Sequence, residues 1–196
     1  MAKTIEDVEQ LLAERGYACR RMSGQCVQTQ LPTEAYVNRE GRKAIDVQIL
    51  IDEQHGCLTM DTPWAFDSHK AEHKEAMLTC LLTASGQSPM VKTQLDPADG
   101  EVRLRVDCRL GAAGVDGDDV FTLLSLIPAF ADRWYPHIKS AMEKGTFDAS
   151  GSLRQANDDR FAAIASRCGG INRLEALFRM QERRKGPPPG TDPSSN

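Results

Sequence analysis

The sequence predicts an α+β fold in which a twisted antiparallel sheet is flanked by helices. Residues 101–109 alternate polar and apolar side chains without a break, directly after a turn at residues 96–100. Residues 43–52 carry an isoleucine or valine at every second position from 45 to 51, whereas apolar residues between 120 and 142 recur every three or four positions. Side chains alternate across a strand and recur every 3.6 residues on a helix, so two of these segments are strands and the third is a helix.

The first element is predicted to be a helix that begins after Thr4 and ends at Gly16. Thr4 caps the start, and Asp7 stands three residues later as in a capping box. The apolar stripe of this helix consists of Ile5, Val8, Leu11 and Leu12. Strands are predicted near residues 17–22 and over residues 25–31, and the polar segment 32–41 is predicted to be a loop.

The clearest buried strand is predicted over residues 43–52. Its inward face carries Ile45, Val47, Ile49 and Ile51. The turn at residues 53–56 leads into a partner strand at residues 57–60, which makes a hairpin. Residues 61–67 are predicted to connect this hairpin to a second helix over residues 69–84.

The second half of the sheet is predicted to be a hairpin made of residues 90–95 and 101–109. Pro97 presets φ and Gly100 tolerates positive φ, so the turn between the two strands has a local cause. A glycine-rich loop at 111–117 leads into a third helix, which opens with two aspartates. Pro128 and Pro136 are expected to kink this helix rather than end it, because the apolar stripe continues past both.

Composition divides the chain into three predicted parts. Residues 1–145 form the α+β domain, residues 146–185 form a helical extension, and residues 186–196 form a disordered tail rich in proline, glycine and serine. Between residues 150 and 185 there are eight basic residues against four acidic ones, and seven of the eight are arginines. This segment is a candidate surface for RNA phosphates or for an acidic partner, or else the solvated face of two amphipathic helices.

Overall composition excludes several classes of protein. The 196-residue chain has a formal net charge of −4, from 24 basic and 28 acidic residues, which gives no whole-molecule basis for nucleic-acid or membrane binding. Its six cysteines form no Cys-x-x-Cys pair, and it shows neither a secretion segment nor an apolar run long enough to span a membrane. Six free thiols without a leader predict the cytoplasm.

One short motif suggests a metal site. Residues 69–73 match the H-x-x-E-H pattern of inverted zinc proteases, in which two histidines four residues apart on a helix hold zinc and the glutamate acts as base. His69, Glu72 and His73 would therefore form a zinc hydrolase site, with Glu143 as the candidate third ligand. The surrounding run of charges, however, is typical of a solvent-facing helix turn, so this site is an alternative and not the main prediction.

Two further patterns are weaker. The loop at 111–117 lacks the lysine of a phosphate-binding loop and is followed by two aspartates, which would repel phosphate. His55 and Cys57 stand two residues apart as a base and a nucleophile would, but the sequence supplies no convincing acid to orient the histidine. The sequence therefore predicts no catalytic, cofactor-binding or metal-ligating residues, no cofactor, and a protein that is not an enzyme.

The order of the elements, the segment Leu95–Val102 and the later run Trp134-Tyr135-Pro136 resemble the YbjN-like family. The resemblance covers about residues 1–144. It implies a fold similar to that of type III secretion chaperones and a role in bacterial sensory-transduction regulation. Members are commonly dimeric, and the family has no catalytic residues to transfer to this chain. The arginine-rich segment after residue 145 departs from the family pattern and leaves the mode of dimerisation open.

Taken together, these features predict a non-catalytic protein that binds another macromolecule. We expect a chaperone-like or regulatory adaptor that takes a peptide segment of a protein partner at a sheet edge or a helix groove. A homodimer is expected, because symmetric pairing is a common way to cover residual apolar surface. The alternatives are a nucleic-acid adaptor that uses the C-terminal arginines and the zinc hydrolase at His69, Glu72 and His73.

Overall fold

The computed structural model describes residues 2–112 and 114–148. The chain divides into two units, Met1–Ala149 and Ser150–Asn196, and all described elements belong to the first. Beyond residue 148, the predicted helical extension and tail lie outside the described residues. The elements of the first unit are α1 (Ile5–Glu14), β1 (Cys19–Ser23), β2 (Cys26–Pro32), β3 (Ala44–Asp52), β4 (Cys57–Asp61), β5 (Phe66–Asp67), the 3-10 helix η1 (Ser68–Lys70), α2 (Lys74–Gln87), β6 (Lys92–Leu95), β7 (Glu101–Arg109) and α3 (Gly117–Lys144).

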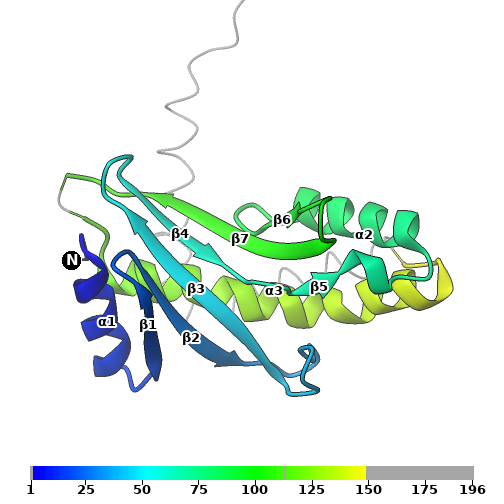
Figure 1. Ribbon diagram of the computed structural model, residues 1–196, viewed down its shortest axis with the longest axis horizontal. Coiled ribbons are helices and arrows are strands. Elements are labelled where there is room, and N and C mark those ends of the chain that lie inside the picture. Colours follow the sequence, from blue (N-terminus) through cyan, green and yellow to red (C-terminus); the bar gives the residue numbers. More distant parts are fainter. Residues whose placement is uncertain (1, 113, 149–196) are drawn as a thin grey trace, which may run out of the picture. The chain divides into compact units, whose positions relative to one another are not determined.

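The strands form one antiparallel sheet in the order β1-β2-β3-β4-β7-β5, and β6 also pairs with β7 (Figure 1). Strand β7 is long enough to have several partners. Its residue Arg105 faces Asp61 of β4 on one side and Lys92 of β6 on the other, while Val102 faces Phe66 of β5. Strands β4 and β5 therefore lie along the same side of β7, one after the other.

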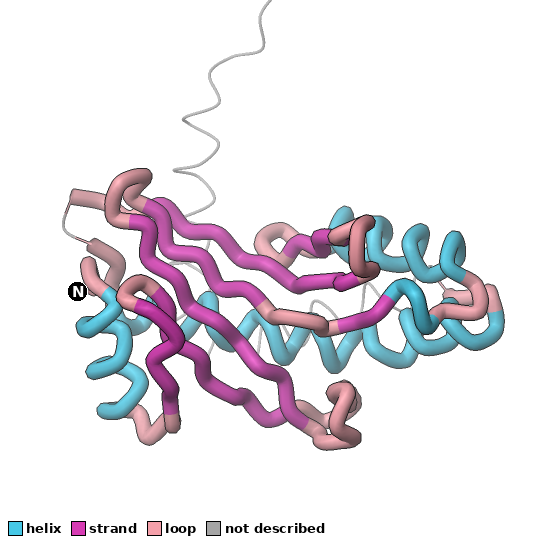
Figure 2. The backbone as a smooth tube through the Cα atoms, in the orientation of Figure 1, coloured by secondary structure: helices cyan, strands magenta, loops and turns pink. Residues whose placement is uncertain are grey.

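All three helices pack on one face of this sheet. On β1, Arg21 stands opposite the buried Val27 and reaches the glutamates of α1. On β6, Thr93 stands opposite the buried Leu104 and bonds to α2. Helix α3 runs behind the strands along the sheet (Figure 2). The core lies between the two layers, and its largest fully buried side chain is that of Trp134.

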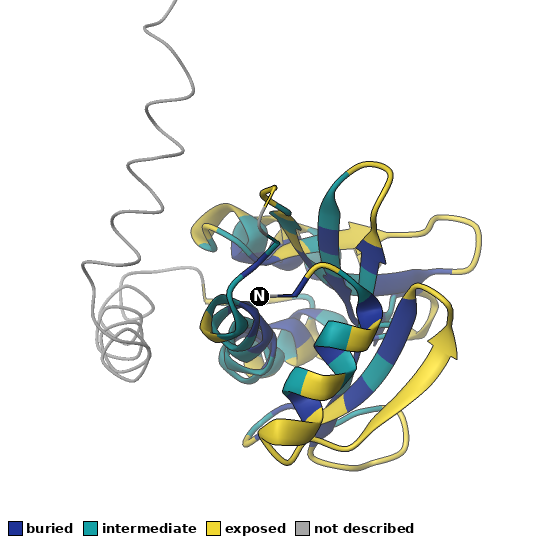
Figure 3. Ribbon diagram, turned by 90° about the vertical axis from the view of Figure 1, so that its left-hand side faces the viewer, coloured by how far each residue is buried: buried dark blue, intermediate teal, exposed yellow. Residues whose placement is uncertain are grey.

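The opposite face of the sheet is polar, and none of the helices among residues 2–112 and 114–148 packs on it; we call it the open face. Every second residue of the central strands points to this face, and most of these residues are polar or charged. At one edge, β1 is exposed at all five positions, as the yellow strand in Figure 3 shows. The predicted α+β class, with helices covering an antiparallel sheet, is confirmed.

Local signals placed most of the elements correctly. Thr4 and Asp7 form the predicted capping box of α1, and the chain leaves that helix at Gly16 with φ of 77°. Helix α3 continues through both prolines from Gly117 to Lys144, as the unbroken apolar stripe predicts. Its N-cap is Asp116, whose side chain accepts the backbone N–H of Asp118. No helix among the described residues is long and apolar enough to cross a membrane.

Two expectations between residues 61 and 74 were wrong. The second helix does not begin at His69, because residues 68–70 form η1 and the backbone is extended at Ala71 before α2 starts at Lys74. A tertiary contact explains the break: the backbone N–H of His73 donates to the carbonyl of Met142 in α3. In addition, the segment predicted as a connection contains β5, whose two residues pair with β7.

Candidate functional site

The chain bulges between β4 and β5. Four residues separate Asp61 from Phe66, but only two separate their partners on β7. Thr62 keeps the pairing intact, because its backbone N–H donates to the carbonyl of Leu104 at 3.0 Å and its hydroxyl accepts the N–H of Leu104 at 2.8 Å. The extra length is therefore taken up by residues 63–65, which we call the 63–65 bulge.

The 63–65 bulge holds Trp64 in a left-handed conformation. Its φ of 54° is the only positive value at a non-glycine position among the described residues. For a bulky residue this conformation costs about 1–2 kcal/mol, so the surroundings must enforce it. Glu101 does so by accepting the backbone N–H of Trp64 at 2.7 Å, and the guanidinium carbon of Arg39 lies 4.1 Å from the centroid of the indole ring.

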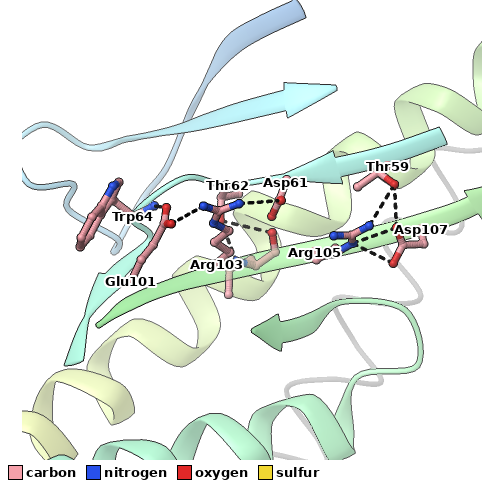
Figure 4. Close-up of polar contacts among 9 residues, drawn as sticks. Thr59, Asp61, Thr62, Trp64, Glu101, Arg103, Arg105 and Asp107 are labelled. Atoms are coloured by element: carbon pink, nitrogen blue, oxygen red, sulfur yellow. Dashed lines mark hydrogen bonds and ion pairs between the residues drawn. The ribbon is translucent and has the colours of Figure 1, made fainter. Parts of the chain in front are cut away.

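A charged cluster made of Asp61, Glu101 and Arg103 lies on the open face of the sheet and supports the bulge (Figure 4). Glu101 is only 2% exposed, and its carboxylate binds the backbone of Trp64 and the guanidinium of Arg103. Arg103 also reaches Asp61 at 3.6 Å. Burial raises the pKa of the Asp61 carboxyl above its usual value, and the nearby arginines at 103 and 105 oppose that shift. The cluster thus ties β4, the bulge and β7 together.

Next to the 63–65 bulge lies a groove with a volume of 410 Å³. It is bounded by the 32–41 loop, by β5 and η1, and by the last turns of α3. The residues that line it are Val37, Asn38, Arg39, Ala65, Phe66, Asp67, Lys70, Glu72, Tyr135, Lys139, Met142 and Glu143. This volume is within the range of pockets that hold a small molecule or a few side chains of a peptide.

Aromatic rings form the floor of the groove. Phe66 and Tyr135 are stacked with their centroids 6.5 Å apart, and Tyr36 packs edge-on against both of them. The Tyr36 hydroxyl donates to the carbonyl of Ala65 at 2.8 Å, and burial raises the pKa of this hydroxyl above its usual value. Because each ring is held by another, the floor is preformed rather than assembled on binding.

The loop that carries Tyr36 and Arg39 is anchored to α3 through Asp132. The carboxylate of Asp132 accepts the backbone N–H groups of Glu34, Ala35 and Tyr36, all at 2.8–2.9 Å. Hydrogen bonds to a charged acceptor are about twice as strong as neutral ones. The loop therefore has a fixed position over the groove although it contains no regular secondary structure.

The rim of the groove carries charges of both signs. Arg39 pairs with Asp67 at 2.7 Å, and Lys70 lies 3.9 Å from the same carboxylate. Lys139 and Glu143 are 3.9 Å apart across one turn of α3. An apolar floor with a charged rim is the arrangement found in grooves that bind peptides and small ligands.

The predicted zinc set is not brought together. The ring of His69 packs over Gly100 and the ring of His73 packs over Gly145, so the two histidines do not share a helix face. Glu72 and Glu143 both line the groove, but within residues 2–112 and 114–148 no group of three side chains is placed to hold a metal ion. His69 lies in η1 and His73 is the N-cap of α2, so the two histidines are not one turn apart on a single helix, which is the arrangement that the zinc prediction required.

The weaker candidates also have structural explanations. The Nδ1 atom of His55 lies 2.7 Å from the Asp52 carboxylate in the exposed turn between β3 and β4, whereas the Cys57 thiol contacts the carbonyl of Leu58 and the hydroxyl of Thr59. The 111–117 loop is a connection that is closed by a bridge between Gly111 and Gly114. The C-terminal arginines lie outside the described residues.

Sequence patterns missed the residues that define the groove. Arg39 lies in a segment predicted only as a loop, and Trp64 and Phe66 lie in one predicted only as a connection. The one local signal was Pro63, which disfavours regular pairing at its own position. The contacts that give these residues a common site come from β7 and α3, which are distant in the sequence.

Three solved chains match this protein in a comparison of structures, and one of them is YbjN from E. coli. It shares 14% sequence identity with this chain, and the match covers 68% of this chain and 92% of YbjN with a TM-score of 0.47. YbjN gives its name to the family that the sequence resembles, and a likeness of this degree concerns the fold alone. No family model and no curated protein matches the chain.

Proposed function

We propose that this protein is a non-catalytic adaptor, regulatory or chaperone-like, that binds a segment of a protein partner in the groove beside the 63–65 bulge. The observation that carries the proposal is the aromatic floor of a 410 Å³ groove, whose rings pack against Tyr36, a residue that Asp132 anchors in turn. A rigid apolar floor lets a partner side chain bind without first ordering the site.

The chemistry of the rim supports binding rather than catalysis. Four of its ionisable groups form two pairs, Arg39 with Asp67 and Lys139 with Glu143. A catalytic site instead needs a nucleophile or base aimed at a position that a substrate atom can occupy. The cytoplasm is the compartment that we propose, because the five described cysteines are free thiols, which persist in reducing surroundings.

A homodimer is a further part of this proposal. Strand β1 offers an edge that is exposed at all five positions, and Tyr17 and Met22 near its two ends are 36% and 44% exposed. Proteins usually cover or protect such an edge, and pairing with a second copy would cover it. Size-exclusion chromatography with light scattering measures the molar mass of the full chain and so tests this part of the proposal. The mass of a monomer at micromolar concentration would contradict it.

The groove itself is tested by site-specific cross-linking in cells. A photo-reactive amino acid at Lys139 on the rim is expected to capture a partner protein, and the same probe at Gln30 on the open sheet face is the control. Met142→Glu, which puts a charge into the groove, is expected to abolish capture from Lys139. Equal capture from both positions, or capture that M142E leaves unchanged, would refute the proposal.

The nucleic-acid alternative predicts a different result. If the arginine-rich segment is the functional surface, the full chain should bind polynucleotide with an affinity that falls steeply with salt, and deletion of residues 150–196 should abolish binding. We expect no such binding at low salt. Tight, salt-sensitive binding that M142E leaves intact would favour the alternative over the groove.

A further inference from the structure

We propose that the partner segment carries a large apolar side chain next to a carboxylate, with the apolar side chain on the aromatic floor and the carboxylate on Arg39. This inference rests on the proposed function and specifies the chemistry of the partner.

Arg39 is held in one place before any partner arrives. Its guanidinium lies over the ring of Trp64 at 4.1 Å and binds the Asp67 carboxylate through Nη2 at 2.7 Å. The left-handed backbone of Trp64 fixes the position of the indole ring, and Asp132 anchors the loop that carries Arg39. A cation that is already ordered loses little entropy when it binds a ligand, which strengthens the interaction.

The guanidinium of Arg39 retains donors for a ligand. It has five N–H groups, and within the described residues Asp67 accepts from one nitrogen while Trp64 covers one face. Both residues line the groove, but the Arg39 side chain is 42% exposed and the Asp67 side chain only 12%, so the cation is the more accessible member of the pair. A planar guanidinium in this state suits the two oxygens of a carboxylate.

The remaining rim charges do not determine the preference. The groove is also lined by two lysines, Lys70 and Lys139, and by two glutamates, Glu72 and Glu143, so the charges of these four side chains cancel. Lys139 and Glu143 are more than half exposed and already form a pair with each other. Exposed pairs on long side chains contribute little, so Arg39 is the charge that selects the partner.

The aromatic floor of the groove indicates which apolar side chain the partner segment carries. Phe66 and Tyr135 present ring surface, and Met142 adds a side chain that adapts to the shape of its neighbours. A phenylalanine or leucine side chain fits such a floor, and a groove of 410 Å³ holds no more than a few side chains. We therefore expect a short motif and not an extended interface.

The test uses four synthetic hexapeptides that differ only at two central positions: Phe-Asp, Phe-Asn, Phe-Lys and Ala-Asp. Binding to the full chain is followed by NMR through the side-chain Nε–H of Arg39 and the indole N–H of Trp64. We expect the Phe-Asp peptide to bind about tenfold more tightly than each of the other three. Shifts of the Arg39 signal should accompany this preference.

Two variants decide the role of Arg39. Arg39→Gln should reduce the affinity for Phe-Asp to that for Phe-Asn and leave Phe-Asn unchanged. Arg39→Lys keeps the positive charge but loses the planar guanidinium that can donate two parallel hydrogen bonds to a carboxylate, so it should retain only part of the preference. Arg42→Lys in the same loop is the matched control, because Arg42 pairs with Glu40 and does not line the groove. The indole N–H signal of Trp134, which is buried in the core, reports whether each variant keeps its fold.

The outcomes separate this inference from the proposed function. Equal binding of Phe-Asp and Phe-Asn to the natural protein, or a preference that Arg39→Gln preserves, would overturn the role of Arg39. No binding of any peptide would overturn the stated partner chemistry. In each of these cases, cross-linking from Lys139 that is abolished by M142E would still support the groove as the binding site.

Discussion

The buried carboxylate of Glu101 gives the sharpest test of how the 63–65 bulge is held. Glu101→Ala removes the acceptor of the Trp64 N–H and the partner of Arg103 in one step. Glu101→Gln keeps an oxygen of similar position for the Trp64 N–H but removes the charge. The comparison therefore separates the hydrogen bond to the bulge from the ion pair beside it.

The expected loss can be worked out from the structure. A hydrogen bond to a charged acceptor contributes about 1.5–3 kcal/mol. The ion pair adds less than about 1 kcal/mol, because the Arg103 side chain is 44% exposed and can return to water. If the Trp64 backbone relaxes from its left-handed conformation, the relief of strain offsets part of the lost unfolding free energy. We therefore expect the free energy of unfolding to fall by about 2–3 kcal/mol in Glu101→Ala and by about 1 kcal/mol in Glu101→Gln.

Urea unfolding of the full chain, followed by far-ultraviolet circular dichroism, measures both losses. Asp107→Asn is the control, because it breaks an exposed pair with Arg105 on the same strand and should cost less than about 0.5 kcal/mol. A loss in Glu101→Ala no larger than that of the control would show that the buried carboxylate does not hold the bulge. Equal losses in E101A and E101Q would assign the effect to charge alone.

Asp61, Asp132 and Cys80 are further residues whose surroundings have measurable consequences. Burial raises the pKa of Asp61 in the folded protein, so the ionised carboxylate destabilises the native state at high pH, and this penalty disappears as the pH falls toward the pKa of the unfolded chain. The increase in unfolding free energy that Asp61→Asn gives over the natural protein should therefore be larger at pH 7 than at pH 4. A difference that does not change with pH would contradict this. Asp132→Ala should destabilise the protein by about 2 kcal/mol and broaden the NMR signals of the 32–41 loop, whereas an unchanged loop would show that the carboxylate is not its anchor. A thiol reagent at pH 8 should modify the exposed Cys19 and spare Cys80, whose pKa burial raises to about 12; mass spectrometry that finds Cys80 modified in the native state would contradict the burial.

Local patterns in the sequence predicted most of the scaffold. The strict alternation of residues 101–109, and the isoleucine or valine at every second position from 45 to 51, gave strands within one residue of β7 and β3, because successive side chains of a strand point to opposite faces. The capping box at Thr4 and the long apolar stripe before Gly145 gave two helices for equally local reasons. These features depend on residues that are close in the chain.

The groove depends on contacts that no local pattern contains. Trp64 takes its left-handed backbone because of a carboxylate 37 residues away, and the 32–41 loop is anchored by Asp132, which lies 96 to 98 residues from the groups that it binds. The start of α2 was misplaced for the same reason, since a carbonyl of α3 takes the N–H of His73. Backbone groups choose their partners after the chain has folded, so periodicity cannot reveal them.

The sequence by itself therefore determined an antiparallel sheet with helices on it, because side-chain periodicity and capping act within a few residues. Only the tertiary structure decided where Arg39, Phe66 and Tyr135 meet, and that the histidines at 69 and 73 do not. The physical reason is that a binding site is made by side chains from separate elements. Their meeting is fixed by the packing of the whole domain and not by any one segment.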